Sequence, residues 1–252
     1  MVTATAAVGL FISVLATAFL SGIFGMAGGI ILMGVCVWLF TVSQAMVLQG
    51  IIQVASNGSR VIMYFHHIVW RIFPGYLLGC LLSLGLFTWI AYVPERGVVF
   101  LMLGLLPFLG VVMRGKYALD VMKPGMPVVC GFIVACVMLT AGVSGPILDS
   151  FFLKSAVSRY QVVATKAVTM TISHIFKLIY FGFLVTIAGP AASDLPWWLF
   201  AIAIPLAFAG TALAKKILEY ISDLQFFRWS TWVVASIGLF FLGRAAHEFF
   251  FV

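Results

Sequence analysis

Charged residues are scarce in this chain. Asp, Glu, Lys and Arg together make up 8% of its 252 residues, whereas hydrophobic residues make up 64%. An ordinary water-soluble domain has about a quarter of its residues charged, so this composition excludes that class and indicates a membrane protein. The apolar runs also lack the alternating apolar and polar residues of outer-membrane strands, and we therefore expect an all-α polytopic membrane protein.

Sequence motifs of enzymes and cofactor sites are missing as well. The chain has no P-loop, no His-Glu-x-x-His and no Gly-x-Ser-x-Gly, and its seven acidic residues form no carboxylate pair on one membrane segment. We therefore expect no enzyme activity, no cofactor and no metal site. The cysteines lie in apolar runs at spacings that fit neither a zinc site nor a redox pair, which favours a packing role. They are Cys36, Cys80, Cys130 and Cys136.

The chain has fourteen basic and seven acidic residues, which give a net charge of +7, and the basic residues are dispersed among the apolar segments. Nucleic-acid binders concentrate Lys and Arg on a soluble face, so we expect no nucleic-acid partner. The expected partners are the lipid bilayer and a small anionic substrate, with monomer and homodimer both left open. The first apolar run lacks the basic start and the cleavage site of a signal peptide, so we expect it to remain in the mature protein.

Ten apolar segments follow one another along the chain. They cover residues 5–22, 28–40, 44–66, 71–91, 97–113, 124–142, 146–157, 160–187, 196–214 and 228–251. Two of them, 28–40 and 146–157, would extend only roughly 18 to 20 Å as helices, which is less than the hydrocarbon core of about 30 Å. Each follows a glycine-rich break, at 21–29 and 140–146, and Pro146 is well placed to open the second short helix.

A long segment, a glycine break, a short segment and three full spans occur in this order twice. Gly22 and Gly25 of the first break fall on Gly142 and Gly145 of the second at a common offset of 120 residues. This regularity predicts two internal repeats, a first transmembrane repeat at 1–118 and a second at 119–252. The boundary lies in the polar connector 114–127.

The basic loops predict the orientation of the two repeats, because cytoplasmic loops carry the excess of Lys and Arg. Four loops are basic, and they hold Arg71; Arg114, Lys116 and Lys123; Lys154 and Arg159; and Lys215, Lys216 and Arg228. With these loops inside, both termini lie outside, segment 44–66 runs inward and segment 160–187 runs outward, so the repeats are inverted. Each long and short pair then enters and leaves on one side, either as a re-entrant hairpin or as two short full crossings.

Inverted repeats whose broken helices meet near the bilayer middle are typical of secondary transporters. A helix that begins at such a break directs unpaired backbone N–H groups and its positive dipole end into the cavity, which favours an anion. Close packing of helices through small residues is the alternative interpretation. The candidate substrate-binding residues of the two breaks are Gly25, Gly28, Gly29, Ser144 and Gly145.

Polar residues line one helical face of segment 44–66 and of its counterpart 160–187. The first stripe holds Gln49, Gln53, Ser56 and Arg60 at spacings of 4, 3 and 4, with Asn57 beside them; the second holds Lys166, Met170, Ser173 and Lys177 at the same spacings, with His174 beside them. These stripes predict one shared aqueous pathway whose cations select an anion. Arg60 and Lys166 could instead snorkel to the interface, whereas Lys177 lies beyond the middle of its segment. The candidate substrate-binding residues of the stripes are Gln49, Gln53, Asn57, Arg60, Lys166, Ser173 and Lys177.

His174 and Asp149 are candidates for proton coupling. An unperturbed histidine has a pKa of about 6.5, which suits proton transfer, although a hydrogen-bonded packing role is commoner. Asp149 sits in the first turns of the short segment, where it could merely complement the positive end of the helix. Lys177 needs a partner, and two are open: a fixed ion pair with Asp149, or an anion in a cavity shared with Arg60, Asn57 and Ser173.

These features resemble the sulfite exporter TauE/SafE family of bacterial anion permeases. The resemblance rests on the glycine-rich break before an apolar run, the polar helix, the tryptophan in 67–71 and the repetition of this pattern. Residues 142–146 are similar to the family's second Gly/Ser/Pro element. The resemblance implies a multi-pass protein of the bacterial cytoplasmic (inner) membrane that exports sulfite or an organosulfonate such as sulfoacetate.

The functional hypothesis is therefore a secondary transporter that exports a small sulfur-containing anion by alternating access, coupled to the proton gradient. The chain has no ATPase domain, so coupling needs an ion gradient or a partner. An anion channel shares every electrostatic feature and differs in having no alternating closure. An exporter of another small carboxylate or oxyanion is the other alternative.

Overall fold

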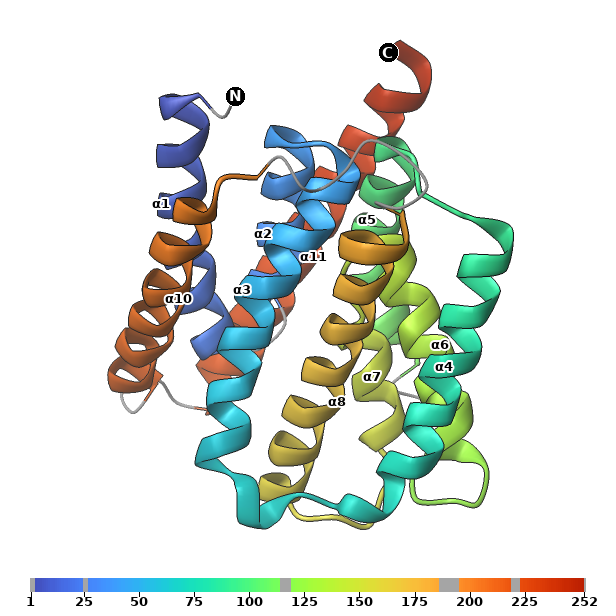
Figure 1. Ribbon diagram of the computed structural model, residues 1–252. Helices are drawn as coiled ribbons and strands as arrows, with labels where there is room; N and C mark the ends of the chain where they lie inside the picture. Colours follow the sequence, from blue (N-terminus) through green and yellow to red (C-terminus); the bar gives the residue numbers. More distant parts are fainter. Residues whose placement is uncertain (1–2, 25–26, 114–118, 186–194, 219–222, 252) are drawn as a thin grey trace.

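Each of the ten apolar segments contains a helix in the computed structural model, which describes residues 3–24, 27–113, 119–185, 195–218 and 223–251 (Figure 1). The second short segment, expected at 146–157, is helical only as far as Phe152. The helices are α1 (Ala4–Phe24), α2 (Ala27–Leu39), α3 (Val42–Met63), α4 (Phe73–Ile90), α5 (Arg96–Val112), α6 (Met126–Ala141), α7 (Gly145–Phe152), α8 (Arg159–Ile179), α10 (Trp197–Leu218) and α11 (Asp223–Phe251). Two 3-10 turns (Phe65–His67 and Trp70–Ile72) precede α4, and a π-helical turn (Tyr180–Leu184) extends α8. No strand occurs in the described ranges, so the predicted all-α class is confirmed.

Four stretches within the described residues are long and apolar enough to cross a membrane: Ala4–Ser21, Trp70–Ile90, Tyr160–Leu184 and Trp197–Ala214. The shorter apolar helices are Ala27–Leu39, Arg96–Gly110 and Met126–Ala141. The protein is thus a multi-pass membrane protein. Helix α7 has 8 residues and rises about 12 Å, which is too short to cross a hydrocarbon core of about 30 Å.

The connections before α4 and α8, and residues 119–125 before α6, gather at one end of the molecule (Figure 1). Hydrogen bonds attach these connections to neighbouring helices. Before α4, the backbone N–H of Val69 donates to the Thr165 hydroxyl of α8 at 3.0 Å; before α6, the N–H of Leu119 donates to the Ser150 carbonyl of α7 at 2.9 Å. The start of α1 and the end of α11 lie at the opposite end. The pair α6–α7 therefore begins and finishes on one side, as a re-entrant hairpin does. The grouped connections contain Arg71, Lys123 and Lys154, and their cytoplasmic placement stays a prediction.

The helices pair in a pattern that exchanges elements between the two halves of the chain. Helix α1 packs on α10 and α6 packs on α4, while α3 packs on α8 and α5 packs on α11. If the first five helices correspond in order to the last five, the α1–α10 pair is the counterpart of the α6–α4 pair. In Figure 1, α3 runs away from the end where α1 begins, and α8 runs toward it. Inverted repeats have these properties, and the division into 1–118 and 119–252 stays a prediction.

The two central helices α3 and α8 begin with the same local structure. Before α3, the Thr41 hydroxyl accepts from the Gln44 N–H at 3.4 Å, and the Gln44 side chain accepts from the Thr41 N–H at 3.3 Å. Ser158 and Gln161 form the same capping box 117 residues later, before α8. The same offset aligns the two polar stripes residue by residue, so the caps place matching stripes on the two packed helices.

Candidate functional site

Lys177 lies at the meeting point of α3, α6 and α8 and is fully buried. Its Nζ donates to the side-chain oxygen of Gln49 on α3 and to the carbonyl of Gly142, 2.9 Å away, at the end of α6. Within the described part of the chain, Lys177 forms no ion pair. A buried ammonium group thus joins the polar stripe of the first half to the glycine break of the second through neutral acceptors.

Two glycines let the helices approach Lys177 closely. A Cβ at Gly50 would lie 2.9 Å from Cδ2 of Leu178 and 3.2 Å from Cε of Lys177, so a larger residue there would push α3 and α8 apart. Gly142 ends α6 with a φ of 76°, a left-handed conformation that favours glycine. Neither Gly50 nor the Gly142 carbonyl is among the residues predicted for the site, because helix contacts and backbone acceptors leave no pattern in a single sequence.

Two buried side chains of this region carry polar atoms without a hydrogen-bond partner among the described residues. They are Nε2 of Gln49 and both ring nitrogens of His174. His174 is fully buried and lies one turn before Lys177 on the same helical face. Buried polar groups are normally hydrogen-bonded, so His174 lacks the contact that a packing histidine would have. The Gln49 amide nitrogen and the one N–H of a neutral His174 ring are therefore available to donate to the oxygen atoms of an anion.

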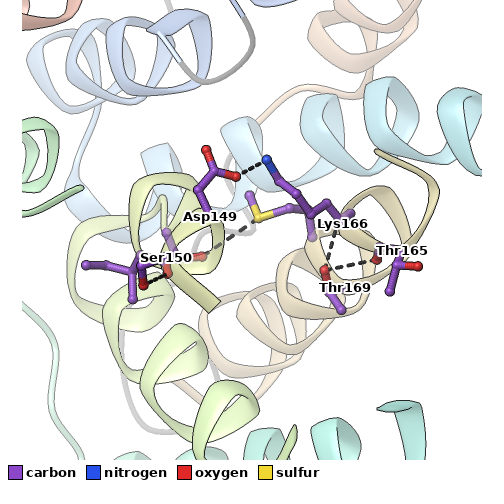
Figure 2. Close-up of polar contacts among 8 residues, drawn as sticks. Asp149, Ser150, Thr165, Lys166 and Thr169 are labelled. Atoms are coloured by element: carbon purple, nitrogen blue, oxygen red, sulfur yellow. Dashed lines mark hydrogen bonds and ion pairs between the residues drawn. The ribbon is translucent and has the colours of Figure 1, made fainter. Parts of the chain in front are cut away.

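Asp149 forms an ion pair with Lys166 rather than with Lys177. The carboxylate extends from α7 toward the ammonium group of Lys166 on α8 (Figure 2). The side chains of Asp149 and Lys166 are 24% and 26% exposed, in contrast to the buried Lys177. The expected alternative of a fixed Asp149–Lys177 pair is therefore wrong, because tertiary packing brings α7 beside the first half of α8 and not beside its end.

Other members of the stripes contact different neighbours. The Ser173 and Tyr76 hydroxyls share a hydrogen bond of 2.6 Å, which directs Ser173 to α4. The Asn57 amide donates to the carbonyl of Gln53 in its own helix at 2.9 Å. Arg60 lies in the last turn of α3 and is partly buried. The expected cavity that Lys177 shares with Arg60, Asn57 and Ser173 stays a prediction.

The polar groups between α3 and α8 fall into two layers, because these helices run in opposite directions. The first layer joins Gln49 to Lys177. About 16 Å toward the end of α3 lies Arg60, and the same distance toward the start of α8 lies Lys166. Arg60 and Lys166 therefore lie at a similar level, where Asp149 pairs with Lys166. One layer has a single buried cation, and the other has two cations and a carboxylate.

The first glycine break lies against α1 and α3. A Cβ at Gly28 would collide with the Thr17 carbonyl of α1, and a Cβ at Gly29 would lie 2.7 Å from the amide nitrogen of Gln53 on α3. Gly28 therefore permits a close helix crossing, as the packing interpretation proposes, and Gly29 lets Gln53 approach the backbone. A cavity beside them has a volume of about 10 Å³, enough for about one water molecule. Gly25 lies outside the described residues.

The second glycine break is buried where α6 turns into α7. Ser144 precedes α7, and its carbonyl accepts from two backbone N–H groups of the first turn, at 3.0 and 3.1 Å. Gly145 is the first residue of α7 and Pro146 the second, as predicted for a helix start. The Ser144 hydroxyl lies 3.9 Å from the sulfur of Met170 on α8. This break is therefore in contact with the polar stripe of the second half.

Metal-binding groups do not come together in the described residues, where no cluster of three or more His, Cys, Asp or Glu could hold an ion. The four cysteines are free thiols, three of them buried and Cys136 half-buried, in keeping with the predicted packing role.

The candidate functional site consists of the two polar layers between α3 and α8 and of the glycine breaks beside them.

Comparison with known proteins places the chain in one family. No curated protein and no solved structure matches it. The sequence profile of the family described as sulfite exporter TauE/SafE matches residues 10–241, which include both glycine breaks and both polar stripes. Since this match covers more than half of the 252 residues, the chain belongs to the sulfite exporter TauE/SafE family.

Proposed function

We propose that this protein is a secondary transporter that exports a small sulfur-containing anion, sulfite or an organosulfonate such as sulfoacetate, across the bacterial cytoplasmic membrane. Membership of the sulfite exporter TauE/SafE family supports a sulfur-containing substrate. The observation that carries the proposal is the buried Lys177, whose ammonium group has only neutral acceptors among the described residues. A transported anion would supply its countercharge.

The energetics of a buried cation favour this role. A lysine inside a membrane costs at least about 2.5 kcal/mol on insertion scales, and functional sites are where such a cost is retained. An oxyanion could accept hydrogen bonds from Nζ of Lys177, from the Gln49 amide and from a ring nitrogen of His174. Sulfite and sulfonates carry three oxygen atoms on one sulfur, one for each of these three donor nitrogens, and hydrogen bonds that involve a charged group are strong.

The second layer would serve as the entrance for the anion. Arg60 is in the last turn of α3 and Lys166 in the first half of α8, toward the end that holds the basic connections. Asp149 offsets the charge of Lys166, so Arg60 supplies the excess positive charge that raises the local concentration of anions. From there an anion would move about 16 Å along the interface of α3 and α8 to reach Lys177. Rocking of the two halves about this interface would expose the site to one side and then to the other, which is alternating access.

His174 supports coupling to the proton gradient. Its ring is buried one turn from Lys177 and is free of hydrogen bonds with the described residues. Imidazole is the side chain best suited to exchange protons near neutral pH, and a proton taken up there would offset the charge of the anion. Asp149 is the weaker candidate, because Lys166 already engages its carboxylate.

Flux through proteoliposomes tests the proposal. Protein reconstituted in vesicles that contain sulfite should release it at a rate that saturates with sulfite concentration and responds to an imposed pH gradient, whereas protein-free vesicles should not. Sulfoacetate, sulfate, taurine and simple carboxylates in parallel vesicles would define the substrate. Flux that neither saturates with sulfite concentration nor responds to the pH gradient would identify an anion channel. Absence of flux for every sulfur-containing anion would contradict the proposal.

A further inference from the structure

A groove outside this site lies between α2, α5 and α11 and has a volume of about 410 Å³. Ligand pockets in proteins have volumes of about 300 to 1,000 Å³, so the groove is large enough for a small ligand or a lipid chain. It shares no residue with the two charged layers. Its walls are almost entirely apolar and include Ile31, Val35, Ile237, Phe240 and Phe241.

One residue that lines the groove is charged, Arg244 of α11. Its guanidinium carbon lies 5.3 Å from the centre of the Trp38 ring and 5.7 Å from that of Phe100, within the range of cation–π contacts. Nη2 donates to the Glu248 carboxylate at 3.2 Å, while the buried Nε has no hydrogen-bond partner among the described residues. A guanidinium group has five N–H donors, so the pair with Glu248 leaves donors for a further acceptor.

The groove runs from the level of the helix ends toward the middle of the molecule. Trp38 is in the last turn of α2 and Phe100 in the second turn of α5, so Arg244 lies near the level where α2 ends and α5 begins. Ile31 and Ser236 lie about 10 to 12 Å further inward along α2 and α11. Trp38 is 59% exposed, and tryptophan is typical of the membrane interface. The groove thus has a cation at the membrane interface and an apolar surface further inward. A phospholipid has its charged headgroup and its acyl chains in the same order.

We propose that this groove binds one phospholipid of the surrounding bilayer, with an acyl chain along the groove and the phosphate against Arg244. Phosphate oxygens accept charge-assisted hydrogen bonds from a guanidinium group, and basic pockets between membrane helices hold lipid headgroups in this way. Glu248 and the Trp38 ring hold the Arg244 side chain at the mouth of the groove. Charge complementarity favours a phospholipid over a second copy of the chain, which would have to bring its own anion to Arg244.

Native mass spectrometry of the purified full chain tests the proposal, with dioleoyl phosphatidylethanolamine and dioleoylglycerol as probes. The two lipids have the same acyl chains, and only the first has a phosphate. We expect the phospholipid to bind roughly tenfold or more tightly than the diacylglycerol, and Arg244→Gln to remove this preference. Ser236→Trp should fill the groove and displace both lipids. Leu239→Trp is the matched control, because Leu239 is 64% exposed on the same helix and does not line the groove.

Three results would overturn the proposal. Equal binding of both lipids, or retention of the phospholipid by Arg244→Gln and Ser236→Trp alike, would show that the groove recognises no headgroup. A dimer that excludes lipid and that Ser236→Trp disrupts would assign the groove to a second copy of the chain. Because Ser236 is exposed, its variant should fold even if Arg244→Gln does not, so the test does not depend on a single substitution.

Discussion

Lys166 and Lys177 lie three turns apart on the same face of α8, yet their surroundings differ. Lys166 is partly exposed and pairs with the carboxylate of Asp149, whereas Lys177 is fully buried and donates to two neutral oxygen atoms. A cation with a counterion in place has little net attraction left for an anion, and a buried cation among neutral groups retains it. We therefore expect the Lys177 layer to bind the anion, while Arg60, which forms no ion pair among the described residues, guides its entry through the Lys166 layer.

Removal of the buried cation should have the largest effect. Lys177→Met should weaken sulfite binding by roughly a hundredfold or more, because the main countercharge is lost. Lys177→Arg should lose less sulfite affinity, since the charge remains while the shape of the donor changes. Isothermal titration of the purified variants with sulfite measures both affinities. Lys123→Met, on an exposed connection, is the control. Unchanged affinity in a folded Lys177→Met protein would remove this lysine from the site.

A second way to disturb the Lys177 layer is to separate its helices. Gly50→Ala would place a Cβ 2.9 Å from Leu178 and 3.2 Å from Lys177, and we expect it to lower the free energy of unfolding by about 1 kcal/mol and to reduce flux several-fold. Gly58→Ala is the matched control on the same helix, because an added Cβ there meets no atom within 4 Å. Thermal unfolding and vesicle flux compare the two. Equal behaviour of both variants would show that this helix contact is dispensable.

The ion-paired layer should respond less to substitution. Asp149→Asn removes a partly exposed ion pair, and such pairs contribute at most about 1 kcal/mol to stability. We expect the sulfite affinity of this variant to stay within a few-fold of wild type in the same titration. A loss as large as that of Lys177→Met would reverse the roles given to the two layers.

Local patterns account for what the sequence predicts well. Continuous apolar runs are found as helices in all ten places, and the short segments begin at the glycine breaks. The helical period places the polar residues of α3 and α8 in stripes, which tertiary structure then packs against each other. Such features depend on residues close in the chain, so periodicity and glycine content are enough to predict them.

Pairings between distant helices could not be predicted in this way. The choice of Lys166 rather than Lys177 as the partner of Asp149 depends on where α7 lies beside α8. The contact of Gly28 with α1 depends on a helix crossing, and so does the approach of Gly50 to Lys177. The lipid groove combines three helices whose residues lie up to 213 positions apart in the chain, from Ile31 to Arg244. Spacing within one segment has no information on these contacts.

The smallest effect is expected at Asp120, a carboxylate outside the membrane-spanning helices that is held, like Lys177, by neutral groups. Its Oδ1 accepts from the Met122 N–H at 2.9 Å and from the Ser155 hydroxyl at 2.8 Å, and these bonds hold its pKa below the usual value. The ionised form therefore stabilises the fold above about pH 4, and this contribution is lost as the pH falls through the folded pKa. Asp120→Asn keeps an acceptor oxygen but cannot ionise, so it should be less stable than wild type at pH 7, by under about 0.5 kcal/mol because the group is partly exposed. Thermal unfolding across this pH range should show the difference shrinking below pH 4, and a difference that grows in acid would contradict the account.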